Sequence, residues 1–211
     1  MKYFNYTLLI SILSTFLLSS CATSKFSLKK DVKIASYYHR NEEGKKQIVL
    51  IDHHGNTLFI SPEEIEGTEM QMGYQQTVSM EKDKQKNIYH VKQVKQTVMD
   101  SASIRLNDMW VLKKINDKKI AKNAPTLTIN LRKETAYGST GCNRYHSQFM
   151  LLGEKKVDFI RIASTKMLCM NANLETEFTS TLEKCDGYAI ANNHLTLTKE
   201  GKVVLDFQKV D

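Results

Sequence analysis

The first 21 residues constrain this chain most, because they indicate the compartment in which the rest must fold. One basic residue, Lys2, precedes an apolar stretch over about residues 6–18, and small residues lead from there to Cys21. That order is typical of an export signal. The apolar stretch is too short for a membrane span, which needs about 20 apolar residues. Removal of residues 1–20 leaves 191 of the 211 residues, which suits one large domain or two small ones.

The cysteine at the expected cleavage point makes this segment similar to a bacterial lipoprotein signal. In such proteins the cysteine thiol receives a diacylglycerol, and the new amino terminus is acylated after cleavage. Several acyl chains give stable anchoring, because each buried methylene adds about 0.8 kcal/mol. Ala22 follows the cysteine, where Asp would favour the inner membrane. The resemblance therefore implies lipidation of Cys21 and an outer-membrane lipoprotein that faces the periplasm.

The net charge of +7 is the main compositional feature of the chain. Its lysines are scattered, which is typical of a solvated surface, although such a surface can also lie along anionic lipid or an acidic partner. Export from the cytoplasm argues against nucleic acid as a partner. We expect no cofactor.

The mature chain divides into two units on the basis of its residue patterns. Residues 21–29 are expected to form the lipidated cysteine and a polar tether, and residues 30–100 a small β-rich domain. Within that domain the sequence predicts strands at 46–51 and 57–60 around a turn at 53–56, one helical turn begun by Ser61 and Pro62, and a hairpin from 74–80 and 88–94. Residues 97–107 carry no strong period and are expected to hold the boundary.

The second unit, residues 104–211, alternates in the way expected of antiparallel strands. Strands are predicted at 126–130, 147–152 and 157–162, and a closing hairpin turns at Glu200 and Gly201. One helix is predicted from a cap at Asn171 or Asn173 to Gly187, with Leu174, Phe178, Leu182 and Cys185 on its apolar stripe. The predicted fold class is α+β, with mostly antiparallel β-structure and one packed helix.

Two sequence blocks in this unit are characteristic when they occur together. They are Gly141-Cys142-Asn143-Arg144-Tyr145 and the segment 163–169, Ala-Ser-Thr-Lys-Met-Leu-Cys. Residues 104–211 on this basis resemble the META domain, also called the HslJ-like family. The resemblance implies a curved antiparallel sheet with one packed helix, in a lipoprotein associated with heat shock and envelope stress. It also implies a fold similar to a secretin pilot lipoprotein that binds lipid. Residues 30–100 are similar to a small domain of unknown function that accompanies META domains.

Three cysteines remain in the mature chain after Cys21: Cys142, Cys169 and Cys185. A bridge between Cys142 and Cys169 would close a loop of about 27 residues and add roughly 3–4 kcal/mol of stability. Two reduced buried thiols are the alternative for this pair. We expect Cys185, on the helix stripe, to be a buried free thiol, although spacing alone also allows Cys169 to pair with Cys185.

Other chemistries are weaker interpretations of the same residues. A zinc site from Cys142, His146, Cys169 and His194 lacks the usual ligand spacing. A thiol hydrolase with Cys142 as nucleophile needs His146 or His194 in contact as its base. The pair His53-His54 is expected in a solvated turn, because adjacent side chains point in different directions.

The leading hypothesis from the sequence is a non-enzymatic envelope lipoprotein that acts by binding, with another envelope protein as the partner. Its recognition face is expected at Gly141, Asn143, Arg144, Tyr145, Thr165, Lys166 and Met167, braced by the Cys142–Cys169 disulfide. The first alternative is a curved sheet that encloses an apolar ligand or lipid cavity lined by Leu127, Ile129, Phe149 and Phe178. A Cys–His hydrolase is the more remote alternative.

Overall fold

The structure is a computed structural model that describes residues 25–168 and 172–210, with Ala172 and Asn173 described by their backbone alone. The predicted signal, Cys21 and Cys169 therefore lie outside the described residues. Within the described part of the chain, no helix combines the length and the apolar character that a membrane crossing requires.

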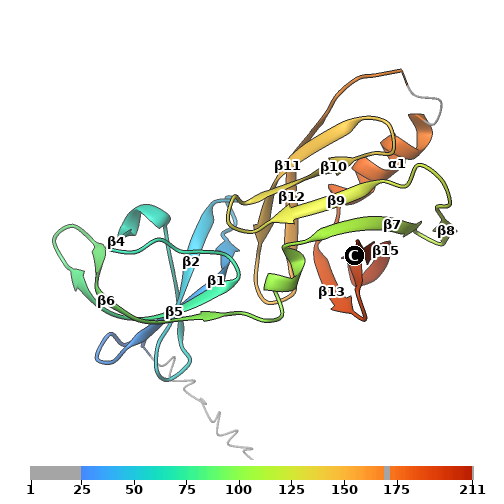
Figure 1. Ribbon diagram of the computed structural model, residues 1–211. Coiled ribbons are helices and arrows are strands. Elements are labelled where there is room, and N and C mark those ends of the chain that lie inside the picture. Colours follow the sequence, from blue (N-terminus) through green and yellow to red (C-terminus); the bar gives the residue numbers. More distant parts are fainter. Residues whose placement is uncertain (1–24, 169–171, 211) are drawn as a thin grey trace, which may run out of the picture.

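The described chain consists mostly of β-strands, with one α-helix and two short 3-10 turns (Figure 1). In chain order these elements are β1 (Val32–Arg40), β2 (Lys46–Ile51), β3 (Thr57–Ile60), the 3-10 turn η1 (Pro62–Glu64), β4 (Ile65–Glu66), β5 (Tyr74–Asp83), β6 (Ile88–Met99), the 3-10 turn η2 (Ile104–Leu106), β7 (Met109–Ile115), β8 (Lys118–Lys119), β9 (Thr126–Asn130), β10 (Thr135–Ser139), β11 (Arg144–Leu151), β12 (Val157–Ser164), α1 (Ala172–Leu182), β13 (Gly187–Ala191), β14 (His194–Lys199) and β15 (Lys202–Lys209).

The strands form two sheets. The first has six strands in the order β3-β2-β1-β5-β6-β4, and its single parallel pairing is between β4 and β6. The second has nine antiparallel strands in the order β12-β11-β10-β9-β7-β15-β14-β13, with β8 beside β7. The predicted mostly antiparallel architecture with one helix is confirmed.

The second sheet curls until its two edge strands meet at one end. An isolated bridge joins Lys156, just before β12, to Gly187 at the start of β13, and the Tyr188 backbone N–H donates to the Lys155 carbonyl oxygen at 3.0 Å. Helix α1 packs on this sheet through Phe178, which is fully buried. The Phe178 ring meets the rings of Tyr145 and Phe207 edge-on, at centroid distances of 5.6 and 6.3 Å. The helix therefore covers part of the apolar face of the sheet.

Alternation of apolar and polar residues explains why these segments form strands of the second sheet. Along β11, Tyr145, Ser147, Phe149 and Leu151 are buried, while the residues between them are more exposed. Leu127 and Ile129 of β9 follow the same period of two. One face of each strand thus contributes to the core and the other remains in solvent.

The apolar core continues from one sheet into the other. Met72, which is 2% exposed, places its sulfur 3.2 Å from the Leu151 backbone N–H of β11. Glu134, between β9 and β10, accepts hydrogen bonds from the Tyr38 hydroxyl at 2.9 Å and the Lys46 ammonium at 2.8 Å. The two sheets are therefore joined by buried packing and by a polar cluster at its rim.

Several predicted elements coincide with the structure. Strands β2, β3 and β9 have the predicted bounds, and the closing hairpin turns at Glu200 and Gly201, both with positive φ. The predicted helical turn at Ser61 is η1, where the Glu64 carboxylate accepts from the Ser61 backbone N–H at 2.8 Å.

Other elements differ from prediction for identifiable reasons. Helix α1 ends at Leu182, and Gly187 begins β13 without positive φ. Glycine at this position serves close packing, because a Cβ there would lie 2.6 Å from the Thr198 hydroxyl. The β5–β6 hairpin is longer than predicted, because the second half of β6 is exposed and so lacks the apolar alternation that marks a strand in sequence. Residues 25–29, the described part of the predicted tether, do not extend freely from the first sheet, because Phe26 and Leu28 pack against the core.

The predicted turn after β2 is organised by one carboxylate. Asp52 is 4% exposed and accepts backbone N–H bonds from Ser27, His54 and Asn56 at 2.8 to 3.0 Å, and a side-chain bond from Asn56 at 2.9 Å. Burial acts to raise the pKa of the Asp52 carboxyl, but these hydrogen bonds outweigh it and hold the pKa below its usual value. His53 and His54 are exposed on the turn, as predicted.

We expect Asp52→Asn to reduce the free energy of unfolding, and the loss to depend on pH. A carboxyl whose folded-state pKa is lowered stabilises the fold above its unfolded pKa of about 4, and this contribution disappears as pH falls through the folded value. Urea unfolding of both proteins should show a constant difference between about pH 6 and 8 that narrows below about pH 4. Asp117→Asn, in an exposed turn, is the control. A difference that does not change with pH would contradict this assignment.

Candidate functional site

The two characteristic sequence blocks meet at one end of the second sheet. The first block occupies the connection from β10 to the start of β11, and the second runs from the end of β12 into the segment 165–168 (Figure 1). Tyr145 pairs with Ser164 across the two strands, and the Thr165 backbone N–H donates to the Arg144 carbonyl oxygen at 3.0 Å. Residues about 20 positions apart in the sequence are therefore in direct contact.

Asn143 is the residue that ties these segments together. Its side-chain oxygen accepts from the Thr165 hydroxyl at 2.7 Å and from the Met167 backbone N–H at 2.8 Å. Its side-chain nitrogen donates to the Glu175 carboxylate at 2.7 Å and to the Met167 carbonyl oxygen at 3.3 Å. With 3% of its surface exposed, Asn143 joins three segments from inside the protein. We call this arrangement the Asn143 bracket.

The turn that carries Asn143 is closed by Thr140. The Thr140 backbone N–H donates to the Asn143 carbonyl oxygen at 2.8 Å, and the Asn143 backbone N–H donates to the Thr140 hydroxyl oxygen at 3.0 Å. Both residues are buried, so these reciprocal bonds satisfy polar groups that water does not reach. They also fix the direction in which the Asn143 amide points.

Two glycines, Gly141 in the first block and Gly138 three residues before it, are required by backbone contacts. A Cβ on Gly138 would lie 2.1 Å from the Thr126 carbonyl oxygen, and one on Gly141 would lie 2.2 Å from the Asn123 carbonyl oxygen. Gly141 also has a φ of +95°, which disfavours other residues. The turn can therefore lie against the segment before β9 only without side chains at these positions.

Tyr145 belongs to the core. It is 3% exposed, its hydroxyl donates to the Thr126 carbonyl oxygen at 2.9 Å, and burial raises the pKa of its phenol well above the usual value. Tyr145 and Asn143 were both expected on the recognition face, and the structure instead places them beneath it. They support that face and do not form its surface.

The exposed part of the predicted face lies on both sides of the bracket. Cys142 and Arg144 are exposed on the β10–β11 side, and Thr165 and Lys166 on the other. Met167 is 58% exposed and Leu168 is fully exposed, although both are apolar. We call Met167 and Leu168 the apolar tip. Leu168 was not among the predicted face residues, although it lies within the second sequence block.

The cysteines differ in state. Cys185 is a buried free thiol, as predicted, and it donates to the Thr181 carbonyl oxygen at 3.3 Å. Burial, with a smaller effect from Asp186, raises the pKa of the Cys185 thiol to about 12. This state excludes the alternative pairing of Cys169 with Cys185. Cys142 is not a free thiol, but its predicted partner Cys169 lies outside the described residues.

The histidines proposed for zinc or acid–base chemistry occupy separate surroundings. His146 is exposed on β11, whereas His194 on β14 lies 3.1 Å from the Asp206 carboxylate, measured from its Nδ1 atom. Among the described residues, no group of three His, Cys, Asp or Glu side chains has the arrangement of a metal site. The described part of the chain therefore supplies no observation in favour of either chemistry.

A cleft of about 640 Å³ lies where the two sheets adjoin, and it was not predicted. It is lined from both sheets and from the segment between β6 and β7. Tyr37 and Tyr188 contribute aromatic surface, and Asp100 and Glu154 contribute carboxylates. The sequence contained no signal for it, because its walls come from segments up to about 150 residues apart.

The electrostatics of this cleft keep its phenols protonated. Burial, together with the charges of Asp100 and Glu154, raises the pKa of Tyr188 to about 12 and raises that of Tyr37 as well. The Asp100 carboxylate accepts from the Ser36 hydroxyl at 2.8 Å. Arg105 also lines the cleft, so its wall offers both charge signs beside apolar surface.

The apolar cavity expected inside the curved sheet is a different place. Leu127, Ile129, Phe149 and Phe178 are 0–2% exposed and belong to the packed core, and none of them lines the cleft. The described structure thus offers no observation in favour of that cavity.

We expect Asn143→Ala to lower the free energy of unfolding by about 1–3 kcal/mol, because it removes the hydrogen bonds that the buried Asn143 amide makes to Thr165, Met167 and Glu175. Segment 165–168 should also become more sensitive to limited proteolysis. Asn143→Asp should destabilise the protein more at neutral pH than in acid, since it places a carboxylate against Glu175.

The control is Asn130→Ala, which removes an amide that accepts one backbone bond in an exposed turn. Chemical denaturation and proteolysis of all four proteins supply the comparison. If Asn143→Ala and Asn130→Ala have equal effects, Asn143 does not act as a bracket.

Comparison of the chain with known proteins identifies the family to which it belongs. Three solved structures are similar to parts of the chain. An NMR structure without a stated source has 24% identity and a TM-score of 0.40, and the match covers 49% of this chain and 89% of that chain. An NMR structure of a protein from Burkholderia xenovorans has 23% identity and a TM-score of 0.43, with 56% of this chain and 96% of that chain covered, and a crystal structure of a DUF4847 family protein from Bacteroides vulgatus has 18% identity and a TM-score of 0.37, with 50% and 96% covered. No curated protein matches. The family model of the META domain matches residues 102–211, which contain the Asn143 bracket, the apolar tip and both characteristic blocks. The chain therefore belongs to the META domain family.

Proposed function

We propose that this META protein is a non-enzymatic binding protein of the bacterial envelope, anchored by lipid at Cys21 and facing the periplasm from the outer membrane. The observation that carries the binding role is the apolar tip. Met167 and Leu168 are exposed, yet their segment is held by the Asn143 bracket through the Met167 N–H and carbonyl oxygen. Exposed apolar side chains on a fixed backbone are suited to contact with another protein.

The charged residues around the apolar tip extend this proposed contact surface. Arg144 and Lys166 are exposed on its two sides, and arginine is frequent at protein interfaces. A partner with an apolar pocket and an acidic rim would match this arrangement. Pairing of Cys142 with Cys169 is part of the proposal, because it would tie the segment after the tip to the β10–β11 turn from the outer side.

Binding is better supported than hydrolysis by the surroundings of the candidate catalytic groups. Cys142 is not a free thiol, and a nucleophile requires a thiolate with a base in contact. His194 faces Asp206 on the β14–β15 hairpin. The characteristic residues Asn143 and Tyr145 serve packing and hydrogen bonding, as their burial indicates. A role in stress response, as in the resembling family, is an expectation that expression measurements under heat can address.

Cys21→Ala should move the protein from the membrane fraction to the soluble fraction of a bacterial envelope, because it removes the acylated thiol. Fractions should be washed at high ionic strength, so that electrostatic adsorption does not hide the loss of the anchor. Cys185→Ala, which changes a buried thiol elsewhere, should leave fractionation unchanged. Continued membrane association of Cys21→Ala after the salt wash would overturn the anchor.

The double substitution Met167→Glu with Leu168→Glu should weaken capture of an envelope partner by roughly tenfold or more, because buried apolar anchors dominate such interfaces. Capture from intact envelopes is compared with the wild-type protein. The matched control is Met109→Glu with Val203→Glu, which places the same charges on two other exposed apolar residues. A capture profile that is identical for all three proteins, or lost equally in both variants, would contradict the assignment of the tip.

A further inference from the structure

The described chain begins with a dense run of basic residues. Residues 25–33 contain four lysines and one carboxylate, Asp31. Lys25, Lys29, Lys30 and Lys33 are exposed, whereas Val32 is buried. The segment therefore separates its residues by polarity, with its ammonium groups in solvent.

This segment is held against the first sheet. The Ser27 backbone N–H donates to the Asp52 carboxylate at 3.0 Å, and the Lys29 backbone N–H donates to the Ser27 hydroxyl at 3.3 Å. Lys33 lies on β1, where it pairs with Ile51 of β2 and Thr77 of β5. The lysines are thus carried on a docked backbone, which reduces the entropy lost when they bind a surface.

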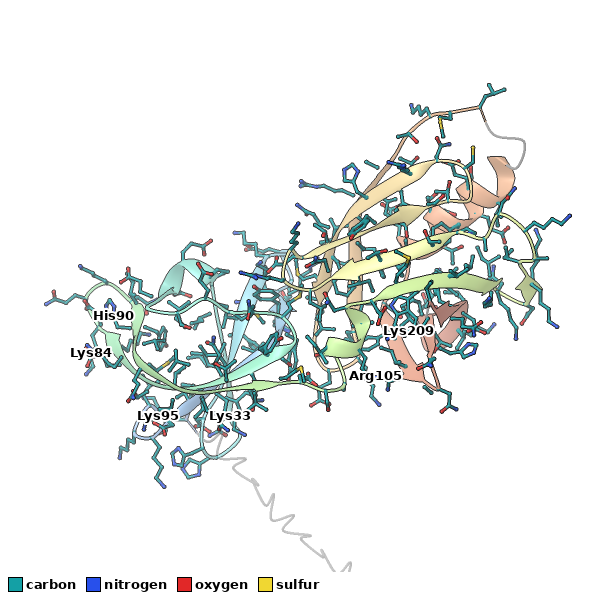
Figure 2. The ribbon with its side chains drawn as sticks, in the orientation of Figure 1. Lys33, Lys84, His90, Lys95, Arg105 and Lys209 are labelled. Atoms are coloured by element: carbon teal, nitrogen blue, oxygen red, sulfur yellow. The ribbon has the colours of Figure 1, made fainter. Side chains whose placement is uncertain are left out.

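A fifth lysine joins the run from another strand. Lys95 of β6 forms an ion pair with Asp31 at 2.8 Å, and Figure 2 shows Lys33 and Lys95 on the lower side of the first sheet. Asp52 is a second carboxylate beside the segment, and it accepts hydrogen bonds from Ser27, His54 and Asn56. Five lysines against two carboxylates leave a surplus of three positive charges. We call these five lysines the N-terminal basic surface.

The position of this surface relative to the proposed anchor is fixed by the length of the chain. Lys25 follows Cys21 by four residues, and four extended residues span at most about 14 Å. An anchor at Cys21 would therefore hold the start of the N-terminal basic surface close to the headgroups. The local concentration of headgroups around it would be far above any bulk value.

We infer that the N-terminal basic surface binds the anionic phospholipid headgroups of the membrane that carries the anchor. The inference rests on the proposed lipid anchor for its location, but the charge complementarity is a property of the described residues. Lysines near an anionic bilayer are attracted individually, and the attraction falls off within a Debye length of about 8 Å at physiological salt. Four of the five lysines lie within nine residues of chain, so they can act on one patch of bilayer.

Headgroup binding would orient the molecule. In Figure 1 the described chain begins near the lower edge of the first sheet, whereas segment 165–168 lies at the upper end of the second sheet. A membrane beneath the N-terminal basic surface would leave the apolar tip directed toward the periplasm. Orientation and the proposed partner contact are therefore compatible.

The test uses the mature chain from residue 21 with Cys21→Ser, so that headgroup binding is measured without acylation. Sedimentation with vesicles should show binding to phosphatidylglycerol mixed with phosphatidylcholine, little binding to phosphatidylcholine alone, and loss of binding as salt is raised. In the triple variant Lys29→Gln, Lys30→Gln and Lys33→Gln, the affinity for the anionic vesicles should fall by at least about tenfold.

The matched control is Lys114→Gln, Lys119→Gln and Lys122→Gln, three exposed lysines of the second sheet and its adjoining loop. This control variant loses the same number of positive charges, and its affinity for the anionic vesicles should stay within about twofold of that of the Cys21→Ser chain. Circular dichroism and thermal unfolding confirm that both variants fold.

Three outcomes would overturn the inference: equal loss in both triple variants, equal binding to neutral vesicles, or binding to soluble polyglutamate but not to anionic vesicles. The last outcome would indicate an acidic protein partner. Failure of the anchor appears separately, as salt-resistant membrane association of Cys21→Ala.

Discussion

The continuous apolar core is the constraint on which the rest of this structure depends. The segment between β6 and β7 contributes to that core and does not act as a free linker, because Ser103 and Leu106 in it are fully buried. The Trp110 indole N–H donates to the Leu106 carbonyl oxygen at 3.3 Å, which fixes this crossing against the start of β7. Each sheet consequently depends on the other to cover its apolar side chains. The cleft at their junction exists only while that packing is intact.

A buried amide that is hydrogen-bonded through both its oxygen and its nitrogen explains why one sequence block has its particular residues. Asn143 has to satisfy its polar atoms inside the protein, since an unpaired buried group costs about 1–3 kcal/mol. It does so with Met167, Thr165 and Glu175, which come from segments that follow it by 22 to 32 residues. The neighbouring glycines permit the close backbone approach that this geometry needs. The block 141–145 therefore positions the surface segment 165–168.

Much of the fold was predictable because local patterns decide it. Strands such as β9 alternate strictly, and the turn at Glu200 and Gly201 is marked by its glycine. Strand β10 and the distal part of β6 were not recognised, since their residues are exposed or small. At the candidate site the sequence located the correct segments but assigned Asn143 and Tyr145 to the surface. Burial of a polar side chain depends on partners that are distant in sequence, so composition does not reveal it.

The burial of the Cys185 thiol has a consequence for its oxidation. Thiol–disulfide exchange requires a thiolate, and with a pKa of about 12 the Cys185 side chain is ionised in roughly one molecule in 10⁵ at neutral pH. Once the segment after α1 has packed, Cys185 therefore does not compete for another sulfur. Removal of the thiol from water by the fold thus slows disulfide exchange at this position.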